Sequence, residues 1–277
     1  MKKVSDFIIY SNILISICAG GLIWETYLLL NIPVNLYCVA IGFDATLMIY
    51  NIDRLVVLEE LKNNGSERHD WIFRFRVLLI IMSIASIIFL GVSAFLIPFH
   101  CLLFLVHLGL ISLLYSVPVL FKGSRSLRSI KLLKIFLIMY VWAATTVFLP
   151  AIWSGQDIFQ RDIMLLFIER ALFIFAITLP FDMRDYRSDK LNHVITIPGI
   201  IGIRQTRLLA FACLLVFFII NAIHYSVYDG ILWAKLLSGL NALILIWFTN
   251  EKKHEYYYTG LIDSTMLIQF LLVLVLR

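Results

Sequence analysis

Long hydrophobic runs separated by short polar segments cover almost the whole chain. Each run is long enough to cross a bilayer as a helix, which takes about 20 residues. The predicted spans are Phe7–Leu30, Val34–Val57, Val77–Ile97, Phe99–Phe121, Leu132–Ala151, Ile163–Phe181, Leu208–Tyr228, Ile231–Thr249 and Tyr258–Leu276. The pattern therefore predicts an all-α integral membrane protein, with about nine transmembrane helices in a single domain over residues 1–277.

Composition agrees with this pattern. Hydrophobic residues make up 61% of the chain and charged residues 15%, whereas an average soluble domain is roughly half apolar. The four cysteines, Cys18, Cys38, Cys101 and Cys213, lie inside hydrophobic runs without the spacing of a metal site. We interpret them as small packing residues.

Basic residues are distributed unevenly between the two sides of the predicted helices. Of the 23 lysines and arginines, all but Arg161, Arg170, Lys235 and Arg277 fall on one side. Because basic residues near helix ends stay in the cytoplasm, the N-terminus and the long polar connections are predicted to be cytoplasmic. The features fit a bacterial inner membrane, with a eukaryotic organelle as the alternative. These cations set topology and meet anionic membrane lipids, so the net charge of +5 does not predict nucleic-acid binding.

Three aspartates end the sixth predicted span, in the segment PFDMRDYRSDK at residues 180–190. On a helix, Asp182, Asp185 and Asp189 share one face over roughly 10 Å. Their mutual repulsion is relieved if cations bind, and Mg²⁺ prefers one or two carboxylates together with substrate phosphates. The spacing favours a Mg²⁺ site for a substrate with an anionic head and an apolar tail. The alternative is a solvated helix end, in which basic neighbours in the segment pair with the acids.

The longer string DMRDYRSDKLNHVITIPGIIG, residues 182–202, resembles the second aspartate-rich motif of the UbiA superfamily of intramembrane prenyltransferases. In that family an Asp-x-x-Asp-x-x-x-Asp run leads into a Thr-x-Pro and a Gly, matched here by Thr196, Pro198 and Gly202. The segment from Tyr115 to Pro118, followed by Lys122, is similar to a family segment after the fourth helix. The resemblance implies a bundle of about nine helices, with its aspartate motifs facing the cytoplasm.

The first motif of that family, Asn-Asp-x-x-Asp-x-x-x-Asp, is only partly matched by NIDRLVVLE at residues 51–59. Asn51 is kept, Ile52 and Leu55 stand where aspartates belong, and Glu59 takes the last acidic position. Asp53 is a substitute acid, but it lies about 200° around a regular helix from Asn51. We therefore expect Asp53 to share the face of Asn51 only if the helix end unwinds.

The resemblance implies a Mg²⁺-dependent prenyltransferase. The donor would be an isoprenyl diphosphate, and the acceptor a lipophilic, aromatic molecule such as a quinone precursor. The implied catalytic and metal-binding residues are Asp182, Asp185 and Asp189, with Asp53 and Glu59 as further metal ligands and with Asn51, Arg68, Lys122 and Arg125 on the diphosphate.

Two rival functions stay open. A non-catalytic relative that binds a polyprenyl lipid or a partner protein is suggested by the partial first motif. A transporter is suggested by charged residues within the spans, namely Glu25, Asp44, Glu169 and Arg170. For these residues we prefer an ion-pair network, with Arg170 bound to Asp44 or Glu25, over a proton path or an acceptor-binding role.

Overall fold

The computed structural model of the chain describes residues 2–57, 67–116, 132–191 and 194–277. Within these ranges all regular structure is helical, which confirms the predicted all-α class. The helices are α1 (Lys2–Tyr10), α2 (Ile13–Leu29), α3 (Leu36–Val57), α4 (Glu67–Arg74), α5 (Arg76–Ser93), α6 (Phe99–Ser116), α7 (Leu133–Ala143), α8 (Leu149–Trp153), α9 (Arg161–Leu191), α10 (Ile197–His224), α11 (Gly230–Trp247) and α12 (Asp263–Leu276), with π-helical segments η2 (Ala144–Phe148) and η3 (Tyr257–Ile262).

The predicted spans overlap these helices, although α10 begins at Ile197 and not at Leu208, and residues 117–121 of the fourth predicted span lie outside the described residues. In the described part of the chain, 7 helical stretches are long and apolar enough to cross a membrane, and the bent pair α1–α2 brings the number to 8. The shorter apolar helix at Phe99–Ser112 occupies the fourth predicted span. The predicted count of nine is therefore approximate, while the multi-pass architecture is confirmed.

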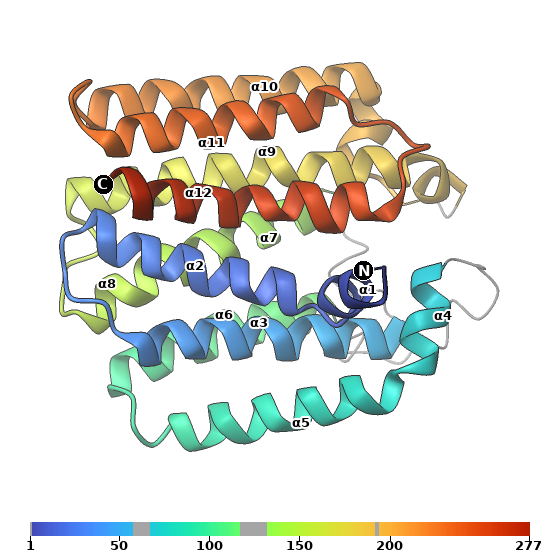
Figure 1. Cartoon of the computed structure of the whole chain (residues 1–277), viewed down its shortest axis with the longest axis horizontal. Helices are drawn as coiled ribbons and strands as arrows, with labels where there is room; N and C mark the ends of the chain where they lie inside the picture. Colours follow the sequence, from blue (N-terminus) through green and yellow to red (C-terminus); the bar gives the residue numbers. More distant parts are fainter. Residues whose placement is uncertain (1, 58–66, 117–131, 192–193) are drawn as a thin grey trace.

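The long helices run roughly in one direction and form a bundle (Figure 1). Helix α2 packs between α3 and α12, α9 packs against α7 and α10, and α5 lies along α3. The two chain termini lie at opposite ends of the bundle, the N-terminus beside α4.

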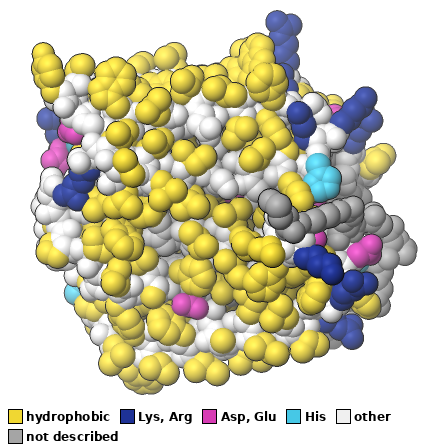
Figure 2. Space-filling view, in the orientation of Figure 1, with side chains coloured by type: hydrophobic (Ala, Val, Ile, Leu, Met, Phe, Trp, Pro, Cys, Tyr) yellow, Lys and Arg dark blue, Asp and Glu magenta, His cyan; other side chains and the backbone are white. Residues whose placement is uncertain are grey.

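The surface of the bundle suits a bilayer. Hydrophobic side chains cover the middle of the face shown in Figure 2, while lysines and arginines gather at its ends, mainly the end that carries α4. Many large apolar side chains on α5 and α10 are exposed, including Ile81, Ile88, Leu208 and Leu215. Exposed apolar surface on this scale is stable in contact with lipid and not with water. The chain is a multi-pass membrane protein.

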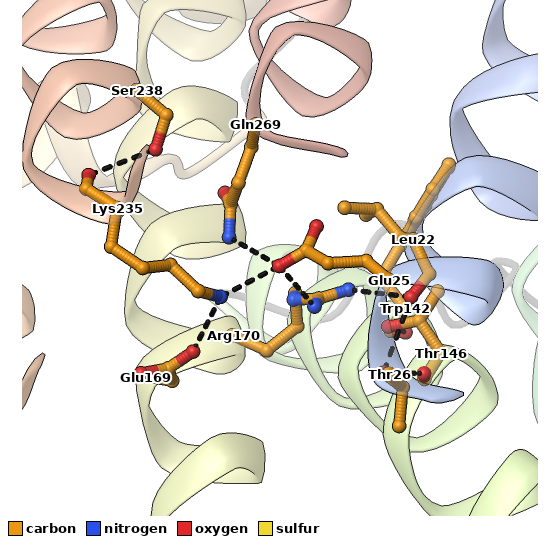
Figure 3. A network of polar contacts seen from close by, with 10 residues as sticks. All are labelled: Leu22, Glu25, Thr26, Trp142, Thr146, Glu169, Arg170, Lys235, Ser238 and Gln269. Atoms are coloured by element: carbon orange, nitrogen blue, oxygen red, sulfur yellow. Dashed lines mark hydrogen bonds and ion pairs between the residues drawn. The ribbon is translucent and has the colours of Figure 1, made fainter. Parts of the chain in front are cut away.

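A network of charged side chains is buried inside this bundle (Figure 3). It joins Glu25 of α2, Glu169 and Arg170 of α9, Lys235 of α11 and Gln269 of α12, and all five residues have 0% of their surface exposed. Two acids and two bases make the network neutral. Since a buried charge is stable only when it is paired, the network ties four helices together.

Glu25 is the central acceptor of the network. Its Oε1 accepts hydrogen bonds from Arg170 Nη2 at 3.0 Å, Lys235 Nζ at 2.6 Å and Gln269 Nε2 at 3.1 Å. Lys235 Nζ also donates to Glu169 Oε1 at 2.6 Å. The ion pairs expected in the network interpretation are therefore present, with Glu25 as the partner of Arg170. Asp44 instead accepts a hydrogen bond from Ser86 of α5 at 2.9 Å.

Close approach of α11 to the end of α12 depends on Gly230. A Cβ atom placed there would collide with the backbone carbonyl of Leu276. We expect Gly230→Ala to lower the free energy of unfolding by about 1–3 kcal/mol, as overpacking does. Gly91→Ala is the matched control, because a Cβ atom there meets nothing within 4 Å. Equal melting temperatures of the two variants in one detergent would contradict this prediction.

Candidate functional site

A cavity of about 460 Å³ runs through the half of the bundle formed by α3, α5, α6, α7 and α9. Its charged lining residues come from the helix ends nearest α4: Asp53 and Arg54 of α3, Arg68 of α4, Lys134 of α7, Asp182, Arg184 and Asp185 of α9, and Asp263 of α12. The rest of the lining is largely apolar. The cavity thus has a charged head and an apolar body.

The predicted aspartates lie on one continuous helix, because α9 extends through Leu191. Asp182 and Asp185 line the cavity, and each is paired with a base. Lys134 Nζ donates to Asp182 Oδ1 at 3.1 Å, and Arg184 binds Asp185 through two hydrogen bonds of 2.7 and 2.9 Å. Asp189 lies one turn further on, beyond the residues that line the cavity.

The end of α3 brings a third acid to the cavity. Asp53 lines it although α3 stays helical through Val57, so no unwinding is needed. Asn51 is fully buried on another side of α3, where its Oδ1 accepts a hydrogen bond from Asn12 Nδ2 at 2.8 Å. Asn12 stands at the 58° bend between α1 and α2, in the left-handed conformation that asparagine tolerates. In the described structure Asp53 lines the cavity and Asn51 does not.

Two arginines stand on the same side of the cavity as Asp53. Arg68 of α4 is 92% buried and binds Glu255. Arg54 lies close enough to Arg68 for their charges to interact, and within the described structure the Nε atoms of both side chains are buried without a hydrogen-bond partner. Sequence reasoning predicted Arg68 as a diphosphate ligand and missed Arg54.

Asp263 is the acid that sequence reasoning missed. It begins α12, directly after the π-helical segment η3, and lines the cavity within electrostatic range of Arg54, Arg68 and Arg184. π-helical segments are often found at functional sites. The signal that would have found Asp263 is a single acid within a hydrophobic span, which is a functional candidate on energetic grounds.

The apolar body of the cavity contains a pair of aromatic residues near its charged head. Trp142 Nε1 donates a hydrogen bond to the Tyr50 hydroxyl at 3.2 Å, and the two rings meet edge to face. Beyond them the lining is mostly apolar, with Leu90 of α5, Ile97 of the α5–α6 connection and Leu105 of α6. Such a cavity has room for an apolar chain attached to a charged group.

Three predicted site residues, Glu59, Lys122 and Arg125, lie outside the described residues. Of the other six, the structure brings Asp53, Arg68, Asp182 and Asp185 to one cavity. Their roles, and those of Asn51 and Asp189, stay predictions.

The donor atoms around the charged head fit a magnesium ion that also binds substrate. In the described ranges no three His, Cys, Asp or Glu side chains are grouped closely enough to hold a metal ion by themselves. Asp182 and Asp185 are nevertheless on adjacent turns of α9 at the cavity wall, and Mg²⁺ commonly binds one or two carboxylates plus substrate phosphates. The described residues therefore suit a Mg²⁺ ion that substrate phosphate helps to hold.

Comparisons with known proteins identify the fold. No protein-family model matches the chain, and no curated protein matches its sequence. A UbiA homolog from Aeropyrum pernix K1 has a similar structure, with a TM-score of 0.64 at 16% identity over 94% of this chain and 97% of that one.

Two further solved structures are similar to this chain over almost its whole length. A UbiA homolog from Archaeoglobus fulgidus, bound to GPP and Mg²⁺, gives a TM-score of 0.59 at 13% identity over 98% of this chain and 100% of that one. A structure of digeranylgeranylglyceryl phosphate synthase gives 0.59 at 16% identity over 100% of this chain and 99% of that one. The chain therefore has the fold of UbiA homologs, and the resemblance drawn from its aspartate motif is confirmed at the level of the fold.

Proposed function

We propose that this membrane protein transfers a prenyl group from an isoprenyl diphosphate to a lipophilic acceptor. The observation that carries the proposal is the cavity, whose described residues place four acids and four bases at its head and an apolar body behind them. A molecule with an anionic head and a long apolar tail matches this division. The Archaeoglobus fulgidus homologs bound to GPP or DMAPP with Mg²⁺ have the same fold, which supports this choice of donor.

Asp182 and Asp185 would hold Mg²⁺ together with the diphosphate, and the ion would neutralise charge on the leaving group. Arg68 and Lys134 line the same head and would neutralise further phosphate oxygens. In the reaction the bond between the prenyl carbon and the diphosphate oxygen breaks, and its electron pair leaves with the diphosphate. A nucleophilic carbon or oxygen of the acceptor then bonds to the prenyl carbon, and the acceptor loses a proton.

The apolar body supplies the conditions that this chemistry needs. An allylic cation survives only where water is excluded. Aromatic faces attract cations, and Tyr50 and Trp142 are the aromatic pair between the head and the body of the cavity. An aromatic acceptor, such as a quinone precursor, is electron-rich enough to capture the cation, and we propose this class. The charged head is proposed to face the cytoplasm.

The direct test is turnover of geranyl diphosphate by the detergent-purified protein with Mg²⁺ and hydroxylated aromatic acid acceptors. We expect pyrophosphate release together with a prenylated product in mass spectrometry. We also expect Mg²⁺-dependent thermal stabilisation by the donor, of roughly 2.7 kcal/mol at 100 times Kd. Stabilisation without product would favour the non-catalytic alternative, in which the cavity binds a polyprenyl lipid. Absence of both from a folded protein would contradict the proposal.

A further inference from the structure

We propose that Arg54 of α3 and Arg68 of α4, which both line the cavity, form a diphosphate-binding site that needs no metal ion. The inference rests on the proposed function and adds a binding residue, Arg54, to it. It also assigns different roles to the two groups of residues in the charged head. The α9 side would bind metal, and the α3–α4 side would bind phosphate oxygens directly.

Arg54 and Arg68 form a pair of like charges close to each other. Both line the cavity, the charge of Arg68 acts on Arg54, and each side chain has a buried Nε atom without a hydrogen-bond partner among the described residues. Two neighbouring guanidinium groups repel each other, and an anion that binds both relieves the repulsion. Guanidinium groups suit phosphate in particular, because their N–H donors match two phosphate oxygens at once. Unused buried donors at a cavity wall therefore point to a phosphate ligand.

The remaining charges of the head explain why this pair stays available. On the α9 side, Asp182 and Asp185 each have their own base, Lys134 and Arg184. On the α3–α4 side, Arg68 binds Glu255 through Nη1, which leaves the Nε atom for another acceptor. The acids near Arg54 balance its charge without using every donor.

The formal charges of the cavity lining support the same division between metal binding by α9 and phosphate binding by α3 and α4. Among the described residues, the charged lining consists of four acids, Asp53, Asp182, Asp185 and Asp263, and four bases, Arg54, Arg68, Lys134 and Arg184, so their formal charges cancel. Because these charges already cancel, the charged head of the cavity can bind an anion without first binding several divalent cations. In the sequence, Ile52 and Leu55 occupy two positions at which the resembled motif has aspartates, and Arg54 lies between them. Fewer acids on either side of Arg54 favour direct binding of the diphosphate.

The test measures binding of inorganic pyrophosphate to the full-length protein in detergent, by isothermal titration, once in EDTA and once in Mg²⁺. We expect the wild type to bind pyrophosphate in EDTA. We expect Arg54→Gln to weaken this metal-free binding by about 10- to 100-fold, the effect of losing charge-assisted hydrogen bonds. Arg54→Lys keeps the charge but not the paired donors, and we expect an intermediate loss. Melting temperatures show whether each variant is folded.

Arg187→Gln is the matched control, since Arg187 of α9 pairs with Glu251 and its side chain is 81% exposed outside the cavity. We expect its metal-free pyrophosphate affinity to equal that of the wild type. The inference is overturned if the wild type binds no pyrophosphate in EDTA, or if folded Arg54→Gln and Arg54→Lys bind it as the wild type does. Turnover of geranyl diphosphate by the wild type separates the two proposals: turnover together with either of these results refutes the role of Arg54 and leaves prenyl transfer standing.

Discussion

Asp185→Asn should lower the turnover of geranyl diphosphate by at least about 100-fold, and Asp182→Asn should do the same. Both carboxylates line the charged head of the cavity, and an amide is a much weaker Mg²⁺ ligand than a carboxylate. Losing one group that stabilises charge on a leaving group typically reduces the rate by two to three orders of magnitude. The measurement is initial-rate pyrophosphate release at saturating Mg²⁺.

Asp189→Asn is the variant with which the turnover of the Asp182 and Asp185 variants is compared. Asp189 belongs to the same motif but lies one turn beyond the cavity lining. If contact with the cavity decides the effect, its rate should fall less than that of the other two variants. Equal losses in all three would show that the motif acts as one unit in solution. Full activity of folded Asp185→Asn would contradict the proposed metal site.

Lys235→Met should be the most destabilising single change outside the cavity, at about 3–5 kcal/mol. Lys235 is fully buried and donates to both Glu25 and Glu169. Removing it leaves two carboxylates and one arginine in the apolar interior, and an unpaired buried charge is costly. The measurement is the melting temperature, or the denaturant midpoint, of the purified protein in detergent.

The double variant Lys235→Met with Glu169→Gln tests the reason for this effect. It leaves one acid and one base, Glu25 and Arg170, which are joined by a 3.0 Å ion pair. We expect it to be more stable than Lys235→Met alone, because the network is neutral again. A double variant no more stable than the single one would show that packing, and not charge balance, sets the cost.

The position of the transmembrane helices could be read from the sequence because each helix is defined by its own composition. A helix of about 20 apolar residues is stable in a bilayer whatever its neighbours are. The bend at Asn12 and the π-helical segments η2 and η3 could not be read in this way. They depend on contacts between helices, such as the 2.8 Å hydrogen bond between Asn12 and Asn51.

The candidate site was predictable only where its residues are neighbours in the chain. The aspartates of α9 form a local motif, so their spacing revealed them. The role of Asp53 was uncertain from sequence, because a helical-wheel angle to Asn51 gives a relative direction but not the position of the cavity. The structure places the cavity on the side of Asp53.

The sequence by itself determined the membrane class, the approximate number of helices and the aspartate motif, since these follow from local hydrophobicity and spacing. Only the tertiary structure decided that Arg54, Arg68, Lys134 and Asp263, from four different helices, line one cavity with the α9 aspartates. It also decided that Arg170 pairs with Glu25 and not with Asp44. The physical reason is that charges within a membrane protein are stable only beside partners or ligands, and helix packing decides which partners meet.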